Sequence, residues 1–248
     1  MRVEVFFGSA GLTAGDATGR VVVVIDVLRA STTIATALAN GARAVIPLES
    51  SDEVVTRAKA FDRCEVKLAG ERQMRPIAGF DLGNSPREFT PETVEGKTVL
   101  LSTTNGTAAI AAAQGPRDVV IASYVNFSAV LTMLRTALRG GTDIAIVCAG
   151  REKQFSLEDA ACAGRYVHHV TRRLSDVVLN DAALAGMLID RRYSDNLLRL
   201  FSASAHGRAL SEAGYGDDLA DCAAIDSYPV IPIYQDRQIT KLGPERAR

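Results

Sequence analysis

RVVVVIDVLRASTT, at residues 20–33, is the most informative stretch of this sequence. Its run of four valines and an isoleucine is typical of a strand buried on both faces of a parallel sheet. The next residues, TTIATALANGA (32–42), are rich in alanine and end near Gly41, which predicts a helix with a glycine C-cap. An acid, a base and three hydroxyls therefore lie at a predicted strand-to-helix junction.

A second unit of the same plan lies in the middle of the chain. KTVLLSTTNGTAAIAAAQGPRDVVIAS (97–123) contains a predicted strand, a hydroxyl-rich turn, an alanine-rich helix, a glycine and another strand. Both units place STT near the strand-to-helix junction, and in the first unit RAVIPL (43–48) is the second strand. An internal duplication and two independent units shaped by the same physics both account for this likeness.

The remaining pattern also alternates between strands and helices. We expect strands at 3–7 and 142–150, a helix capped by Ser51 or Asp52, and mainly helices from about 165 to 224. YPVIPIY (228–234) predicts a late strand at a sheet edge because it contains two prolines, and the tail KLGPERAR is expected to fray. The predicted fold is an α/β domain over 1–248 with a mainly parallel, mixed sheet flanked by helices, or two closely packed lobes.

Composition excludes several classes of protein. The 248 residues are 47% hydrophobic and 23% charged with a net charge of -1, so no bulk charge attracts nucleic acid or a membrane. Four separated cysteines form no CxxC or metal pattern and fit a reducing cytosol. The N-terminal apolar stretch is too short for a signal peptide, and no run approaches a membrane span. We expect a cytoplasmic protein and leave a homodimer open.

Three polar junctions, at 26–33, 102–107 and 150–159, come after predicted strands, where ligands bind in open α/β sheets. Helix N-termini hold anions, and an arginine fork matches a phosphate. N-capping alone explains one hydroxyl-rich turn. Two such turns, one with Asp-x-x-Arg, favour a site for a phosphorylated small molecule, and its candidate binding residues are Arg29, Ser31, Thr32, Thr33, Thr103, Thr104, Asn105, Gly106 and Thr107.

Carboxylates would form the second half of this site. Asp26 ends the most apolar strand, where an unpartnered charge is costly. Glu158 and Asp159 begin a predicted helix, and the helix dipole favours acids in a first turn whether or not they bind a metal. Three converging carboxylates, Asp26, Glu158 and Asp159, would suit Mg²⁺. The aperiodic segment 69–89 could fold over the strand ends and supply Glu71, Arg72, Asn84 and Ser85, although GNSP also reads as a turn.

Common catalytic patterns are missing. The sequence contains no Walker A motif, no GxGxxG and no GxSxG elbow, so nucleotide binding and serine hydrolase chemistry have no specific support. His168 and His169 lie in a helix-like stretch without an acid or cysteine at ligand spacing, which favours packing.

Five separate stretches together resemble the 2-phosphosulfolactate phosphatase family. They are VVVVIDVLRASTTIATALANGA, AGER, GFDLGNSP, LLSTTNGT and CAGREKQFSLEDAACAG, in the order expected from about residue 20 to 164. The last third resembles the family only loosely. The resemblance implies an α/β fold distinct from the common phosphatase folds, and a Mg²⁺-dependent acid phosphatase that converts 2-phosphosulfolactate to sulfolactate on the route to coenzyme M.

Combined with the residues, this resemblance predicts a division of roles. Asp26, Glu158 and Asp159 would hold Mg²⁺, and Arg29 with the 31–33 hydroxyls would bind phosphate. The 103–107 turn, with Arg72 or Arg151, would bind the sulfonate and carboxylate, and Glu71 would be the acid–base group. Direct attack by water ranks before an aspartyl-phosphate on Asp26, because Asp-x-Asp is missing. A non-catalytic binder of phosphorylated or sulfonated metabolites, and a phosphatase for another phosphorylated hydroxy acid, are the alternatives.

Overall fold

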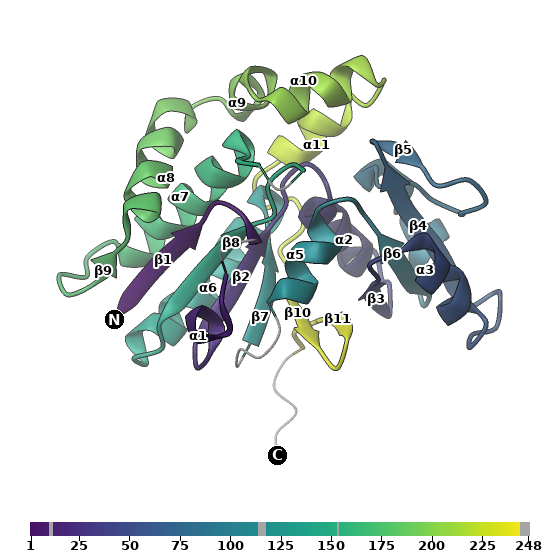
Figure 1. The fold of residues 1–248 in the computed structure, drawn as a ribbon, viewed down its shortest axis with the longest axis horizontal. Helices are drawn as coiled ribbons and strands as arrows, with labels where there is room; N and C mark the ends of the chain where they lie inside the picture. The colour runs from purple at the N-terminus through teal and green to yellow at the C-terminus, as the bar shows by residue number, and fades with distance from the viewer. Residues whose placement is uncertain (10–11, 114–117, 153, 244–248) are drawn as a thin grey trace.

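One twisted sheet runs through the molecule in the computed structural model, which describes residues 1–9, 12–113, 118–152 and 154–243 (Figure 1). Within these residues the sheet has eleven strands. Their order is β5 (Arg75–Pro76), β4 (Val66–Arg72), β6 (Thr98–Ser102), β3 (Ala44–Pro47), β11 (Gln238–Lys241), β10 (Pro232–Gln235), β7 (Asp118–Ala122), β2 (Val21–Ile25), β8 (Ile144–Cys148), β1 (Arg2–Phe6) and β9 (Val178–Leu179).

Two parallel blocks make up most of the sheet. Strands β7, β2, β8, β1 and β9 are parallel neighbours, and so are β4, β6 and β3. The β10–β11 hairpin joins the two blocks and is antiparallel to the strand on each side of it. The predicted α/β fold with a mainly parallel, mixed sheet is therefore confirmed, and the sheet is continuous across both blocks.

The two similar units of the sequence each connect one block to the other. Strand β2 leads through α2 (Ala30–Ala39) to β3, and β6 leads through α5 (Gly106–Ala112) back to β7. The two units occupy equivalent places on either side of the β10–β11 hairpin, since β3 and β7 flank the hairpin and β6 and β2 lie one strand further out. This arrangement brings the two strand-to-helix junctions together at the centre of the molecule, where α2 contacts α5.

Strand β2 is buried on both faces, as its run of valines predicts. Val21, Val23 and Ile25 pack into the core on one side of the sheet, while Val22 and Val24 pack into the core on the other. Burial of such a strand on both faces contributes a large hydrophobic stabilisation, at roughly 25 cal/mol for each Å² of apolar surface. The strand end that carries Asp26 is therefore rigidly held.

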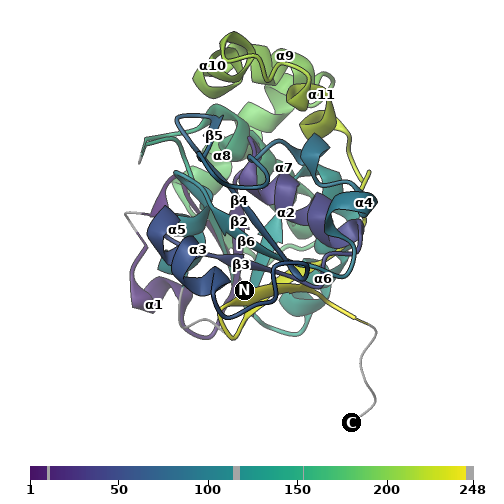
Figure 2. The same ribbon diagram turned by 90° about the vertical axis from the view of Figure 1, so that its right-hand side faces the viewer.

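Most helices cover the faces of the sheet, and three others form a cap over the ends of its strands. The helices that pack near the sheet are α1 (Ala14–Ala17), α3 (Ser51–Ala58), α4 (Pro91–Val94), α6 (Phe127–Arg139), α7 (Leu157–Thr171) and α8 (Asp181–Tyr193), with short 3-10 turns at Pro86–Glu88 and Tyr124–Asn126. The cap consists of α9 (Leu197–Ala203), α10 (Ala205–Glu212) and α11 (Asp218–Ala223), which lie above the strands in both views (Figure 2).

Helices α7 and α8 approach each other closely through glycines. A Cβ added to Gly164 of α7 would lie 2.0 Å from the carbonyl oxygen of Gly186 in α8. No larger residue fits at this crossing, so the two glycines set the position of α7, whose N-terminus reaches the strand ends.

Three local predictions need correction. The predicted edge strand is wrong, because β10 lies inside the sheet between β11 and β7. It tolerates Pro232 because this proline is the first residue of the strand. The cap of α3 is Ser50, whose side chain accepts a hydrogen bond from Glu53 N, and neither Ser51 nor Asp52 is the cap. Lys241 of the expected frayed tail ends β11, and residues 244–248 lie outside the described residues.

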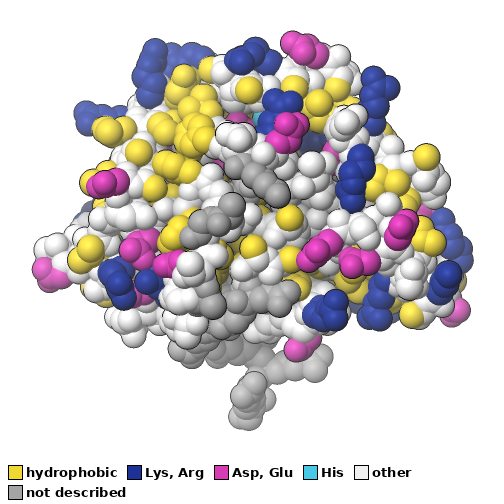
Figure 3. Space-filling model, in the orientation of Figure 1, with side chains coloured by type: hydrophobic (Ala, Val, Ile, Leu, Met, Phe, Trp, Pro, Cys, Tyr) yellow, Lys and Arg dark blue, Asp and Glu magenta, His cyan; other side chains and the backbone are white. Residues whose placement is uncertain are grey.

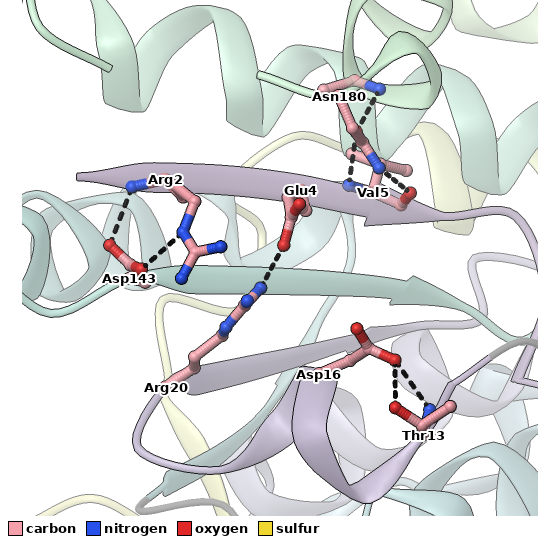
Figure 4. A network of polar contacts seen from close by, with 9 residues as sticks. Arg2, Glu4, Val5, Thr13, Asp16, Arg20, Asp143 and Asn180 are labelled. Atoms are coloured by element: carbon pink, nitrogen blue, oxygen red, sulfur yellow. Dashed lines mark hydrogen bonds and ion pairs between the residues drawn. The ribbon is translucent and has the colours of Figure 1, made fainter. Parts of the chain in front are cut away.

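Side chains pin the N-terminal strand in place (Figure 4). The Asn180 amide donates to the Val5 carbonyl and accepts from its N–H, at 2.9 and 3.0 Å, so it stands in for ladder hydrogen bonds at the end of β1. Asp143 accepts from the backbone N–H and the Nε of Arg2.

Among the helices of the described residues, none has the length and apolarity to cross a membrane.

Candidate active site

A cavity lies at the carboxyl ends of four strands, β2, β4, β6 and β8. Its walls come from residues at or just after those strand ends, from Asn84 in the segment after β5, and from one residue of the cap. They are Asp26, Leu28, Arg29, Glu71, Gln73, Met74, Asn84, Thr103, Thr104, Asn105, Arg151, Glu152 and His206. All three polar junctions that the sequence singles out contribute to this lining. The fold therefore brings them together at one place.

Asp26 is the central carboxylate of the cavity. It follows β2 directly, is 5% exposed, and its Oδ1 accepts a hydrogen bond from the N–H of Ala30 at 3.3 Å. Burial, together with the negative charges of Glu71 and Glu158, raises the pKa of Asp26 to about 6. Gly106 makes room for it, since a Cβ there would lie 2.7 Å from Asp26 Oδ2.

Asp159 joins the ends of two strands. Its Oδ1 accepts from Val27 N at 2.9 Å and its Oδ2 accepts from Gly150 N at 3.1 Å. Burial and the charges of Asp26 and Glu158 raise the pKa of Asp159 well above its usual range. Both carboxylate oxygens are thus engaged by the backbone, and Asp159 positions the loops that follow β2 and β8.

Glu158 pairs with a histidine of the cap. His206 Nδ1 lies 3.2 Å from Glu158 Oε1, and both side chains are largely buried. Burial alone would raise the pKa of Glu158, but the close contact with His206 and its charge outweigh burial and hold that pKa below its ordinary value. His206 lines the cavity, so this pair presents an oriented imidazole to it.

The predicted metal ligands lie near enough to shift one another's pKa values, but they do not all face the cavity. Of Asp26, Glu158 and Asp159, only Asp26 lines the cavity. In the part of the chain that the structure describes, no set of three or more His, Cys, Asp or Glu side chains is arranged to hold a metal ion. The carboxylates that line the cavity are those of Asp26, Glu71 and Glu152.

Glu71 also fixes two turns. Its Oε1 accepts from Thr104 N and its Oε2 from Met74 N, both at 2.8 Å. The neighbouring Arg72 turns away, because its guanidinium donates to the backbone oxygens of Glu71 and Ser102 and to the Ser102 hydroxyl. Arg72 therefore lies outside the cavity lining.

Arg29 lines the cavity but is held by protein groups. Its guanidinium donates to Asp218 Oδ2 at 2.7 Å and to the Met74 carbonyl at 3.1 Å, and it stacks 4.4 Å from the centre of the Tyr215 ring. The other oxygen of Asp218 accepts from the Ser85 hydroxyl at 2.6 Å. Ser85 thus supports this ion pair and does not line the cavity.

The three hydroxyls of the first junction are buried and bonded to the protein. Ser31 Oγ accepts from Asp26 N, Thr32 Oγ1 bonds the Val27 carbonyl and Ser123, and Thr33 Oγ1 donates to the Asn84 carbonyl. None of the three lines the cavity. Their hydrogen bonds hold the start of α2 against neighbouring segments, and they do not face a ligand.

The second junction divides its residues between structure and lining. Thr103 and Thr107 bond each other across the turn, with Thr107 outside the lining. Thr103, Thr104 and Asn105 line the cavity, and Asn105 Oδ1 accepts from Glu152 N at 2.9 Å. Gly106 serves close packing, as described above.

Two lining residues have free polar groups. Asn84 is 5% exposed, and its Oδ1 is buried without a hydrogen-bond partner within the described residues. The Arg151 guanidinium likewise makes no ion pair with any described carboxylate. The unpaired cation of Arg151 suits an anionic ligand, whereas the unmet Asn84 oxygen calls for a hydrogen-bond donor, because an unmet buried polar group is costly.

Sequence reasoning missed His206 and Asp218. Asp218 lies 189 residues from its partner Arg29, and His206 lies 48 residues from Glu158, so no local spacing encodes either contact. The only signal was the loose family likeness of the stretch ALSEAGYGDDLADCAAIDSYPVIPIY, which contains Asp218.

Comparisons with known proteins agree on one family. A family model described as 2-phosphosulpholactate phosphatase matches residues 9–237. A probable 2-phosphosulfolactate phosphatase of Symbiobacterium thermophilum is 42% identical over 229 residues, covering 92% of this chain and 97% of its own. Proteins with the same description from Caldanaerobacter subterraneus and Clostridium botulinum are 40% and 35% identical, covering 85% and 98% of this chain and 86% and 100% of their own. The chain therefore belongs to the 2-phosphosulpholactate phosphatase family.

Proposed function

We propose that this protein is a phosphoric monoester hydrolase that cleaves 2-phosphosulfolactate to sulfolactate and phosphate. Its similarity to relatives described as probable 2-phosphosulfolactate phosphatases supports the substrate. The observation that carries the chemistry is the cavity, where Asp26 with its raised pKa faces the same space as Arg151 and the free amide of Asn84. Cationic and carboxylate groups in one cavity match a substrate with a reacting phosphoryl group and further acid groups.

Arg151 would bind an acid group of the substrate. The free Arg151 guanidinium can take a sulfonate or carboxylate with two parallel hydrogen bonds. The Asn84 amide and the Thr103–Asn105 turn would supply neutral polar contacts. Arg151 fills this role in place of Arg72, whose donors are already used by Ser102 and Glu71.

Two carboxylates of the cavity fit Mg²⁺. This ion is commonly held by one or two carboxylates together with substrate phosphate and waters. Asp26 and Glu71 line the cavity, and the charge of Glu71 contributes to the raised pKa of Asp26, an effect that a bound cation would relieve. We therefore assign the ion to Asp26 and Glu71, and leave Glu158 and Asp159 as positioning residues. Bound Mg²⁺ would polarise the phosphoryl oxygens and lower the pKa of a water.

His206 takes the acid role in this proposal. Glu71, the group predicted for that role, would hold the ion instead, and its two oxygens also accept backbone N–H groups. His206 is oriented by Glu158 through Nδ1, which leaves Nε2 to give a proton to the C2 oxygen of sulfolactate as its bond to phosphorus breaks.

The wider setting is part of the same proposal. Sulfolactate would enter the route to coenzyme M in the cytoplasm, and the four free cysteines fit a reducing compartment. A homodimer is supported by apolar side chains that gather over the region of α8 (Figure 3), where Leu184 and Leu188 are 48% and 67% exposed.

A phosphate-release assay tests the function. Purified protein is given 2-phosphosulfolactate or 2-phospholactate, which lacks the sulfonate, with Mg²⁺ or with EDTA. We expect release that needs Mg²⁺ and is faster with the sulfonated substrate. A calorimetric binding signal without phosphate release would identify a non-catalytic binder, and full activity after exhaustive chelation would contradict the metal assignment.

A further inference from the structure

Four arginines surround a second cavity, far from the active site in the fold. Arg135 and Arg139 lie on the last turns of α6, and Arg172 and Arg173 directly follow α7. Together they line an open surface pocket of about 240 Å³, in which Arg135 is half-buried and the other three arginines are exposed. Helix α6 leads into the amino end of β8, whereas the active-site cavity lies at the carboxyl ends of the strands. The two cavities are therefore at opposite edges of the sheet.

The charge of this arginine cluster is not balanced by the protein. Its lining contains no acidic residue, and no described carboxylate forms an ion pair with any of the four. Arg135 donates from Nε and a terminal nitrogen to the His169 carbonyl, at 3.3 and 3.0 Å. The guanidiniums of Arg139, Arg172 and Arg173 have no such bond within the described residues. Like charges around one cavity repel, and this chain as a whole carries a net charge of -1.

The helix ends explain only part of this arrangement. The C-terminus of a helix carries a partial negative charge, so one cation near each of α6 and α7 is favourable. That field falls off within the last turn. It does not require four guanidiniums to converge on one concave space, where each raises the electrostatic cost of the others. A bound anion would remove that cost.

We infer that the arginine cluster binds a small soluble anion with two or three linked phosphate groups. The planar guanidinium forks match phosphate oxygens in pairs, and several forks around one cavity match adjoining phosphates. The volume is below the roughly 300–1,000 Å³ of cavities that enclose drug-sized ligands, so it suits a di- or triphosphate group. This site is independent of the proposed hydrolysis.

Calorimetric titration with inorganic pyrophosphate in EDTA tests the site. The informative variant is the double variant Arg139→Gln/Arg172→Gln. The matched control is Arg191→Gln, which changes an exposed arginine of α8 that has no ion pair among the described residues. Arg151→Gln removes the free cation of the active site. We expect binding to persist in the Arg191 and Arg151 variants, and the double variant to bind at least about tenfold more weakly. Equal affinity in the double variant, or loss of all binding in the Arg151 variant alone, would overturn the inference.

Thermal unfolding and competing ligands give a second readout. Without anion, the double variant should melt at the same or a higher temperature than the wild type, because repulsion is removed. Pyrophosphate should raise the melting temperature of the wild type and not that of the double variant, while phosphatase turnover stays unchanged. Tighter binding of RNA or of phosphoinositide-containing vesicles than of pyrophosphate at physiological ionic strength would also overturn the inference, since it would assign the cluster to a macromolecule or a membrane.

Discussion

Asp26 combines deep burial with ionisable neighbours on several sides. Its position after a strand of buried valines is readable from the sequence, because apolar runs and strand ends are local features. The roles of Ser31, Thr32 and Thr33 are not readable, since a hydroxyl near a helix start can cap, bind a ligand or hold another segment. Here they hold other segments, and the ligand-facing groups come from elsewhere.

The raised pKa of Asp26 predicts that this residue costs stability at neutral pH. An unfolded aspartate has a pKa of about 3.9, so the native protein binds the extra proton between roughly pH 4 and 6, and stability falls as pH rises through that window. Asp26→Asn should therefore raise the free energy of unfolding at pH 7.5, without divalent cations, by roughly 1–3 kcal/mol. Urea unfolding at pH 7.5 and 5.0 measures this; the gain should shrink at pH 5.0, and a variant less stable than wild type at pH 7.5 would refute the assignment.

Arg151 should matter for binding more than for turnover. Arg151→Gln removes the unpaired cation of the cavity and should raise KM about tenfold or more, on the roughly 1.5–3 kcal/mol scale of charged hydrogen bonds, with a smaller change in kcat. Arg72→Gln is the control, since its side chain lies outside the lining and should leave KM near the wild-type value. Steady-state kinetics on both variants measure the two KM values. A larger rise in KM for Arg72→Gln than for Arg151→Gln would reverse the roles of the two arginines.

At the scale of elements, the site depends on how the cap meets the first junction. The β2–α2 and β6–α5 units follow from hydrophobic periodicity and turn chemistry, and the sequence predicts both. The docking of α10 and α11 does not follow from any local pattern, because His206 and Asp218 find their partners across long stretches of chain. The same limit explains the wrong edge position of β10, since pairing partners depend on the assembled sheet.

The Arg29–Asp218 pair should be a strong stabilising link between α11 and the first junction. Both side chains are 2% exposed, so Asp218→Ala would leave a buried, unpaired guanidinium. We expect a loss of about 3–5 kcal/mol in the free energy of unfolding. The exposed Asp217→Ala is the control and should change stability by less than about 1 kcal/mol, because its pair with Arg87 lies at the surface. Equal effects of the two variants in urea unfolding would exclude a special role for the buried pair.

At the scale of the whole molecule, the two parallel blocks, the hairpin between them and the cap converge on one cavity. Each crossover unit leaves one block and enters the other, so the hydroxyl-rich turns meet although they are about 70 residues apart. The cap then adds His206 over the strand ends. We therefore expect the carboxylate of Asp26 to be indispensable to the reaction and not to the fold.

Turnover of Asp26→Asn tests that claim most directly. The variant keeps the shape of the side chain and should fold with at least wild-type stability, as argued above. Phosphate release from saturating 2-phosphosulfolactate with Mg²⁺ should fall by about a thousandfold or more, comparable to the loss of a principal electrostatic group. A folded Asp26→Asn protein with a kcat close to that of the wild type would contradict the account.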